Sequence, residues 1–337
     1  MKRETILAND GSMLGMNVGH FDQGRSGVNP IGEAIFANDS RFVEANFSEP
    51  LTIFAVGWKD KDDLKGLLDF IAPPCPTAKR FEFAKGVNAE SFLSEGDDIR
   101  AIGGSFKRVE YTSTKVNSRT YNKGLTIRVD LDNVEGMPNW KEVYTARLMQ
   151  RLLRNEIRRA YALLLAAATN TAKQWSNATD KDPDLTMLGQ CDAFGDVAGM
   201  NCNRVLAGFS AWTNRVQCYS IQATAGGFGG SARSTPEQVA TYLGVDEFRI
   251  SKERYQSSAT AKSKLATADK VIFYNGDPSC TPEDSSSIKR FTSPTTGGTP
   301  FRVFEEQIGA KNYDITVEHY SHIVVTATEG IKNLTIS

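Results

Sequence analysis

The chain has 337 residues, of which 40% are hydrophobic and 23% are charged, and its net charge at pH 7 is −1. The length exceeds one typical domain, and the composition is that of an ordinary globular protein with two or more compact units. A dedicated nucleic-acid binder carries a basic excess over a whole domain, so this charge argues against that class and limits any DNA contact to a local site.

The chain begins with a segment that predicts an arm. Residues 1–50 are rich in Gly, Asn and Asp and have few periodic apolar positions, apart from a short helix candidate at residues 30–36. Apolar residues return over residues 51–69, and residues 71–76 then contain three prolines. Because proline fixes φ and lacks an N–H donor, this stretch predicts an extended, rigid connector.

An extended ribbon is predicted next. Residues 80–83 and 106–116 have strand-like patterns, and the acidic run 94–98 and the pair Gly103 and Gly104 separate them. A two-stranded ribbon with few large apolar residues is marginal alone, so we expect it to lie on a partner surface.

A strand with one buried face is predicted from residue 125. Leu125, Ile127, Val129 and Leu131 alternate with the polar residues Thr126, Arg128, Asp130 and Asp132. This period of two is typical of a strand at the surface of a core.

A long helix follows this strand. Pro138 precedes it, and Asn139 and Glu142 have the spacing of a capping box, which predicts Asn139 as the N-cap. At about 100° per residue, one face of the helix is apolar and the opposite face is cationic. The apolar face contains Met149, Leu152, Leu153, Ile157, Ala160 and Leu164, and the cationic face contains Arg147, Arg151, Arg154 and Arg158. The arginines are either the solvated side of a core helix or a stripe that meets phosphates or a neighbouring subunit's carboxylates.

Short mixed elements are predicted from residue 175 to about residue 300. Thr235, Pro236 and Gly244 mark a short helix, because proline favours the first turn of a helix and glycine the residue after its end. Residues 270–274 predict a strand. A final long strand over residues 313–328, rich in Ile, Val and Thr, is expected to return to the sheet beside the long helix.

The absence of targeting signals and the pattern of cysteines indicate the cellular compartment. No stretch approaches the roughly 20 apolar residues of a membrane span, and the first residues lack the apolar core of a signal peptide, so we expect a cytosolic protein. The five cysteines are odd in number, widely spaced and never in a CxxC pair. We therefore expect reduced, mostly buried thiols instead of disulfides or a zinc site.

No motif for catalysis, a cofactor or a metal survives inspection. His319 and His322 would point to opposite faces of a strand, and His20 is the only other histidine. Residues 208–212 start like a nucleophile elbow but lack its final glycine, and we expect no strand-to-helix junction there. Residues 130–135 lack two positions of a calcium loop. The run Gly226, Gly227, Phe228, Gly229 and Gly230 lacks the Lys and Ser or Thr of a phosphate-binding loop, and we predict a mobile tip.

A set of residues spread over these elements has a familiar order. It comprises Phe70, Ile71, Ala72 and Pro73 before the ribbon; Asp98, Gly103 and Gly104 within it; Asn122, Lys123, Gly124, Leu125, Val129 and Asp130 in the strand; and Leu148, Met149, Leu152, Leu153 and Glu156 in the helix. In this order the chain resembles the major capsid protein of tailed double-stranded DNA bacteriophages, which has the HK97-like fold. The resemblance covers nearly the whole chain through the order and character of its elements.

The resemblance implies an α+β fold with six segments. They are an N-terminal arm (1–50), the first part of a peripheral domain (51–76), an extended β-hairpin loop (77–123), a peripheral domain with a spine helix at 139–173 (124–184), an axial domain (185–300) and a closing peripheral strand (301–337).

The resemblance also implies a structural protein without enzyme activity. Many copies would assemble, as hexamers and pentamers, into an icosahedral shell around double-stranded DNA, in the host cytoplasm and then in the virion. Expected partners are a separate scaffolding protein, because residues 1–50 contain no long charged helix, and a portal; a decoration protein is a further candidate, and no membrane is involved. Some relatives crosslink Lys to Asn between subunits, but no acid lies beside Lys107, Lys115 or Lys123 in sequence, and no crosslink is predicted.

Within such a shell, two sets of residues are candidates for contacts. Arg147, Arg151, Arg154 and Arg158 would face either packaged DNA, through non-specific phosphate contacts, or a neighbouring subunit. The glycine run 226–230 would sit near a symmetry axis, where close approach of several backbones favours glycine.

Two alternatives remain open. The nearer one is an encapsulin-like nanocompartment of the same fold, which would be purified with a cargo protein and without DNA. The more distant one is a soluble two-domain hydrolase with an unrecognised site, which would be a small species in solution.

Overall fold

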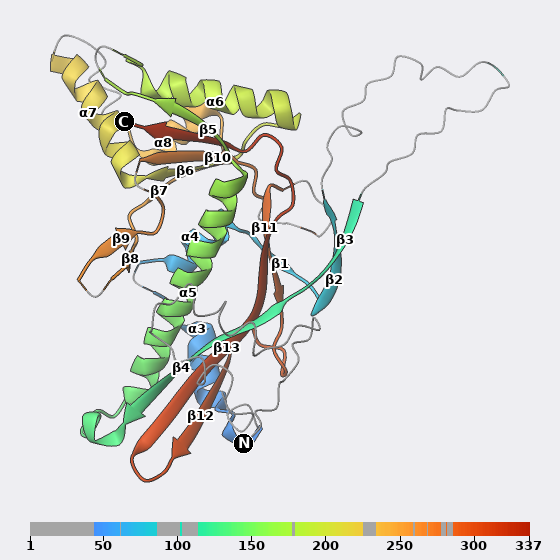
Figure 1. Ribbon diagram of the computed structural model, residues 1–337, viewed down its shortest axis with the longest axis vertical. Coiled ribbons are helices and arrows are strands. Elements are labelled where there is room, and N and C mark those ends of the chain that lie inside the picture. Colours follow the sequence, from blue (N-terminus) through green and yellow to red (C-terminus); the bar gives the residue numbers. More distant parts are fainter. Residues whose placement is uncertain are drawn as a thin grey trace, which may run out of the picture.

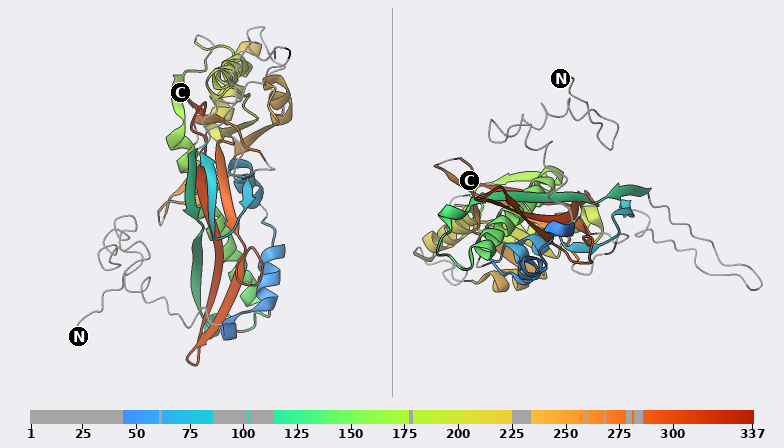
Figure 2. Two further views of the ribbon diagram at one scale, coloured as in Figure 1. Left: turned by 90° about the vertical axis from the view of Figure 1, so that its right-hand side faces the viewer. Right: turned by 90° about the horizontal axis from the view of Figure 1, so that it is seen from below.

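The chain forms an elongated α+β molecule in which one long helix runs beside two sheets, as the computed structural model shows (Figure 1). The structure describes residues 44–60, 62–85, 102, 114–176, 179–224, 234–258, 260–267, 269–277, 281 and 286–337. The predicted helix at 30–36, the acidic run 94–98 and the glycine run 226–230 lie outside these residues. The two sheets follow one another along the long axis of the molecule (Figures 1 and 2).

The first sheet is built around one long strand, β13 (Asn312–Val325). The first half of β13 pairs with both β12 (Arg302–Ile308) and β4 (Tyr121–Asp130), and its second half pairs with β11 (Ile288–Ser293). A short strand, β1 (Pro74–Pro76), extends the sheet beyond β11. The predicted alternating strand is β4, which ends in the 3-10 turn η4 (Leu131–Asn133), and the predicted closing strand is β13.

The long helix is α5 (Trp140–Ala167), and it packs on β13, β4 and the two helices that precede the connector, α3 (Glu49–Gly57) and α4 (Leu64–Ile71). All six residues of its predicted apolar face are buried. Asn139 is the N-cap of α5, as predicted, but the capping box is not formed, because Asn139 has φ −109° and ψ 28° and its side chain makes no capping hydrogen bond. A typical N-cap residue has an extended backbone.

The predicted spine helix over 139–173 is too long. Residues Thr169–Lys173 form the strand β5, which pairs in parallel with the last strand of the chain, β14 (Lys332–Ile336). The β-branched residues Thr169 and Thr171 favour a strand at this position. Pairing with a strand more than 150 residues away therefore ends the helix at Ala167.

The second sheet has the order β5-β14-β10-β6-β7. Its other strands are β10 (Lys270–Tyr274), β6 (Arg204–Gly208) and β7 (Glu247–Ser251), and its helices are α6 (Pro183–Ala198), α7 (Phe209–Thr224) and α8 (Pro236–Leu243). The predictions of β10 and α8 are confirmed. In α8, the side chain of Thr235 and that of Gln238 form a reciprocal capping box, and Gly244 ends the helix with φ 68°.

The sheets do not follow the predicted boundary at residue 300. β11 (Ile288–Ser293) lies before this boundary but belongs to the first sheet, and β14 (Lys332–Ile336) lies after it but belongs to the second sheet. The chain thus crosses between the sheets twice near its end. The division into arm, peripheral and axial domains stays a prediction.

One hydrophobic core joins the two sheets. It contains residues of α4 and α5 together with Leu206 and Ile272 of the second sheet and Ile288 and Ile323 of the first. Arg204 of β6 adds a polar link, because its Nη1 donates to the backbone oxygen of Phe70 at the end of α4 at 2.6 Å. The two sheets therefore share a core on α5.

The base of the predicted ribbon lies on the first sheet. β2 (Arg80–Lys85) pairs antiparallel with β3 (Thr114–Arg119), which confirms the strand predicted at 80–83. The ring centres of Phe81 and Phe83 lie 4.3 and 5.3 Å from that of Phe291 on β11. The predicted extended loop falls largely on residues 86–101 and 103–113, which lie outside the described residues. Aromatic packing fixes β2, at one end of this loop, on the sheet, and pairing with β2 holds β3 at the other end.

Two further expectations can be compared with the structure. Among the described helices, none combines the length and the apolar composition that crossing a bilayer requires. Cys75, Cys191, Cys202 and Cys218 are free and buried, as expected for reduced thiols, and Cys280 lies outside the described residues.

Candidate functional site

The four arginines of α5 lie on the side of the helix that faces away from the core. Arg147, Arg151 and Arg158 are exposed, and the side chain of Arg154 retains 27% of its exposure. Their placement agrees with the helical spacing, since the opposite side of α5 is buried. Their predicted role stays a prediction, because orientation alone does not identify what they contact.

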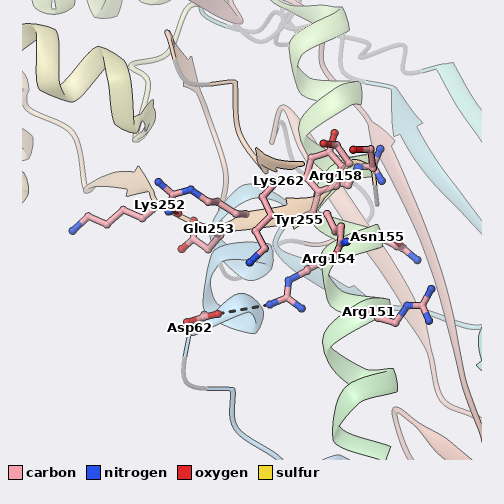
Figure 3. Close-up of a pocket in the computed structure, with 13 residues that line it drawn as sticks. Asp62, Arg151, Arg154, Asn155, Arg158, Lys252, Glu253, Tyr255 and Lys262 are labelled. Carbon is pink, nitrogen blue, oxygen red and sulfur yellow. Dashed lines mark hydrogen bonds and ion pairs between the residues drawn. The ribbon is translucent and has the colours of Figure 1, made fainter. Parts of the chain in front are cut away.

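These arginines do not form one site. Arg147 lies over the ring of Tyr144 on the same helix, with 4.9 Å between the guanidinium carbon and the ring centre. Arg151, Arg154 and Arg158 instead line a groove beside α5 (Figure 3). The structure thus brings three of the four predicted residues together.

The opposite wall of the groove is a hairpin that the sequence analysis missed. β8 (Arg254–Gln256) pairs antiparallel with β9 (Lys262–Lys264), and Lys252 and Glu253 precede it. The hollow between this hairpin and α5 has a volume of ≈ 1140 Å³. The sequence does contain a signal for a cationic segment here, because residues 251–264 contain four basic residues and one acidic residue. Strands of three residues are too short to show a period of two.

The groove, which we call the cationic groove, has a large excess of positive charge. Asp62 lies 3.7 Å from Arg154 and offsets part of this charge. The ring of Tyr255 is covered by Arg158, whose guanidinium carbon lies 4.0 Å from the ring centre. Its described lining consists of six basic residues (Arg151, Arg154, Arg158, Lys252, Arg254, Lys262), two acidic residues (Asp62, Glu253) and five uncharged polar residues (Asn155, Tyr255, Gln256, Ser257, Ser258). It can therefore bind an anion over several contacts.

A separate ionic cluster is buried where β4, α5 and β13 meet. Lys123 donates to Glu156 at 2.9 Å, and Ser321 donates to the same carboxylate at 2.8 Å. Burial alone would raise the pKa of Glu156, but the charge of Lys123, that of His319 once it is protonated in acid, and these hydrogen bonds lower it to about 2. No acid lies beside Lys123 in the sequence, because Glu156 comes 33 residues later. The ion pair is complete within the chain, and no crosslink is inferred from it.

The two histidines of β13 have different surroundings. Burial lowers the pKa of His319 to about 4, and Nδ1 of His322 lies 3.0 Å from the hydroxyl of Ser118 on β3. Within the described ranges, no group of three or more His, Cys, Asp and Glu side chains could hold a metal ion. His20 lies outside these ranges.

The junction at residues 208–212 corrects one expectation. β6 ends at Gly208 and α7 begins at Phe209, so a strand-to-helix junction is present where none was expected. The strand was missed because every residue of β6 is buried, which removes the alternation. Ser210 accepts a hydrogen bond from Lys264 at 2.7 Å, and both described histidines lie on β13 in the other sheet. The elements of a nucleophile triad are therefore not assembled around Ser210 by the described residues.

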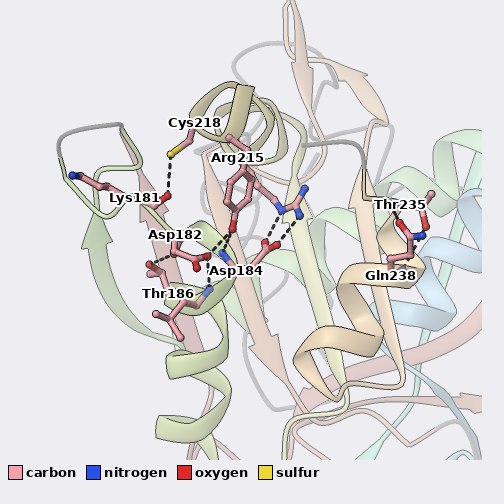
Figure 4. Close-up of polar contacts among 10 residues, drawn as sticks. Lys181, Asp182, Asp184, Thr186, Arg215, Cys218, Thr235 and Gln238 are labelled. Carbon is pink, nitrogen blue, oxygen red and sulfur yellow. Dashed lines mark hydrogen bonds and ion pairs between the residues drawn. The ribbon is translucent and has the colours of Figure 1, made fainter. Parts of the chain in front are cut away.

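A buried polar network fixes α6 to α7 (Figure 4). Arg215 donates through Nε and Nη2 to the two carboxylate oxygens of Asp184 at 2.6 and 2.7 Å. The hydroxyl of Tyr219 donates to Asp182, the N-cap of α6, and accepts from the backbone N–H of Asp184. Burial raises the pKa of Tyr219, which keeps this hydroxyl protonated. The network therefore has a structural role in positioning α6 and α7. The cationic groove is the candidate functional site.

Solved structures identify the fold. The chain is similar to a phage-related protein from Bordetella bronchiseptica RB50, with a TM-score of 0.61 and 14% identity over 86% of this chain and 96% of that one. It is also similar to a protein of Microbacterium phage Oxtober96, with a TM-score of 0.53 and 11% identity over 83% and 93% of the two chains. The chain has the HK97-like α+β fold. No protein-family model and no curated protein sequence matches it.

The HK97-like fold confirms the fold class that the sequence predicts. The residues that carried the resemblance lie at its joints. Phe70 and Ile71 are the last two residues of α4, Lys123 and Gly124 lie in β4, and Glu156 is a buried acid of α5. Asp98 and the pair Gly103 and Gly104 lie outside the described residues.

Proposed function

We propose that the chain is a major capsid protein that assembles, as hexamers and pentamers, into the icosahedral shell around the double-stranded DNA of a tailed phage. The observation that carries this proposal is the similarity to the phage-related Bordetella protein, which extends over 96% of that protein. A shell subunit needs no catalytic centre. The charged residues of the buried ionic clusters described above pair with each other within the chain. The inferred location is the virion, after assembly in the host cytoplasm.

The anatomy of the single chain supports a role in assembly. The β2–β3 ribbon is fixed at its base on the first sheet, and α3 exposes apolar side chains to solvent, Ile53 at 65% and Val56 at 44%. Surfaces of this kind gain burial when copies of one chain contact each other, and closed symmetry repeats each gain over the whole shell. A scaffolding protein, a portal and a decoration protein remain proposed partners.

Light scattering and electron microscopy of the purified full-length chain test this function. The chain is expressed alone and, in parallel, together with the products of its neighbouring genes. We expect closed icosahedral particles that contain nuclease-protected DNA. Particles that contain a cargo protein and no DNA would indicate a nanocompartment, and a monomer at every concentration and in both preparations would contradict a shell.

A further inference from the structure

The cationic groove has the side-chain chemistry of a phosphate-backbone site. In its described lining, arginine and lysine account for six residues, and serine, asparagine and glutamine account for four. These are the residue types that contact phosphate and sugar oxygens in protein–DNA complexes. Arginine adds planar pairs of N–H donors that match two phosphate oxygens at once.

The same lining is a poor surface for a protein segment. Protein partners are anchored by aromatic and aliphatic side chains that enter apolar pockets. Tyr255 is the single aromatic residue among the described lining residues, and Arg158 already covers its ring at 4.0 Å. Aliphatic residues are absent from that described lining. Charge without apolar anchors favours a polyanion over a docked peptide.

The two walls suit an extended ligand. Arg151, Arg154 and Arg158 span about 10 Å along α5, since a helix rises about 1.5 Å per residue. This length corresponds to about three phosphates of one DNA strand. On the other wall, Lys262 of the hairpin reaches toward Arg154, and Lys252, which precedes the hairpin, lines the groove with its side chain directed away from α5 (Figure 3). A backbone that follows α5 would contact cations on both walls.

We propose that the cationic groove binds the phosphate backbone of double-stranded DNA without sequence preference. The proposal deepens the shell function and rests on it for the identity of the polyanion. Asp62 opposes anion binding in the groove, because its carboxylate lies 3.7 Å from Arg154 and has 63% exposure. A phosphate that enters the groove has to compete with this carboxylate.

Two variants change the groove in opposite directions. K252E/K262E reverses two charges on the hairpin wall, where both side chains lie at the surface. D62N removes the competing carboxylate and leaves a side chain of the same shape. The matched control is K115E/K181E, which reverses two exposed lysines outside the groove and changes the net charge by the same amount.

Binding is measured by fluorescence anisotropy of the unassembled full-length chain with a short duplex of mixed sequence at several salt concentrations. We expect K252E/K262E to weaken binding at least about 10-fold and to reduce the slope of log affinity against log salt by about two. We expect D62N to tighten binding about three-fold, because it removes a protein carboxylate that repels the phosphates of the ligand. The K115E/K181E control is expected to bind like wild type.

Three results would overturn the proposal. Equal weakening in K252E/K262E and the control would show that only net charge matters. Wild-type binding in K252E/K262E would show that DNA contacts another surface. The third is binding of a peptide with the acidic sequence of residues 90–102 that depends on Lys252 and Lys262, when DNA binding does not. That result would assign the groove to an acidic segment of a second copy.

Light scattering on the same samples separates this proposal from the shell function. If wild-type shells form normally but K252E/K262E loses no DNA binding, only the proposal that the groove binds DNA is contradicted. A chain that never forms particles but loses DNA binding in K252E/K262E would contradict the shell alone.

Discussion

Glu156 and His319 lie in one buried pocket, and each has its pKa shifted by its surroundings. His319 is 7% exposed, and its Nε2 lies 4.0 Å from Glu156. Burial lowers the pKa of His319 to about 4, so at neutral pH it is uncharged and makes no ion pair with Glu156. The charge of this acid is instead balanced by Lys123 and Arg159. The charges in this buried cluster are therefore balanced at neutral pH, with Glu156 ionised and His319 neutral.

Acidification is expected to destabilise the chain through this pocket. The pKa of His319 falls from 6.5 to about 4 on folding, so the unfolded state binds the proton first. Stability is complete above pH 6.5 and falls as the pH drops to about 4, by on the order of 3 kcal/mol from this residue. The pKa of Glu156 falls from 4.5 to about 2 on folding, so this residue extends the loss of stability from about pH 4.5 down to about pH 2.

Urea unfolding of the unassembled chain between pH 4 and pH 8 measures this effect. We expect H319Q, which has no ionisable group at this position, to lose less stability than wild type between pH 6.5 and pH 4. Above pH 7 the two proteins should have parallel profiles. An unchanged acid slope in H319Q would contradict the assignment to His319.

Arg215 and Asp184 form the ion pair with the strongest expected effect on stability. The Arg215 side chain is 1% exposed, and removing one member of a buried pair leaves an uncompensated charge. We expect R215M to lower the free energy of unfolding by about 3–5 kcal/mol. Lys311 and Asp132 form the control, because their side chains are 64% and 61% exposed and K311M should change little. Equal effects in urea titrations of the two variants would contradict this account.

At the scale of elements, Gly124 decides how closely β4 approaches β13. A Cβ atom at this position would lie 2.7 Å from the backbone oxygen of Val317. We therefore expect G124A to push the strands apart and to cost about 1–3 kcal/mol. In α6, a Cβ at Gly189 meets nothing within 4 Å, and G189A should stabilise the chain by up to about 1 kcal/mol. Opposite shifts of the two thermal midpoints are the expected result.

Elements with local signals were the ones that the sequence predicted well. β4 alternates, α5 has two distinct faces, and α8 begins with Pro236 and ends before Gly244. Elements that depend on distant partners were missed or misjudged. β5 follows α5 only because β14 pairs with it, and β6 has no alternation because it is buried on both faces.

The candidate site shows the same limit at the scale of the whole molecule. Helical spacing placed Arg151, Arg154 and Arg158 on one face, but the hairpin that faces them begins about 100 residues later in the chain. The shared core on α5 brings these segments together, and no local pattern contains that information. Sequence could therefore predict half of the groove.

The outer face of α3 is where the shell proposal has a direct consequence for the whole molecule. This helix is apolar on nearly every side, and helices of that kind are normally buried all round. Leu51 and Ala55 pack in the core of the chain, whereas Ile53 and Val56 are 65% and 44% exposed. A neighbouring copy in the assembled shell would cover them.

We expect I53D/V56D to prevent particle formation while the unassembled chain unfolds at nearly the same urea concentration as wild type, because both side chains already face water. The control I53V/V56I keeps the surface apolar and should assemble normally. Covering one such side chain contributes about 1.5–3 kcal/mol, and closure repeats that gain in every copy, so a small loss per subunit is enough to abolish assembly. Particles that form as readily from I53D/V56D as from wild type, measured by light scattering over a range of concentrations, would place this face in solvent and contradict the role of α3 in the contact between subunits.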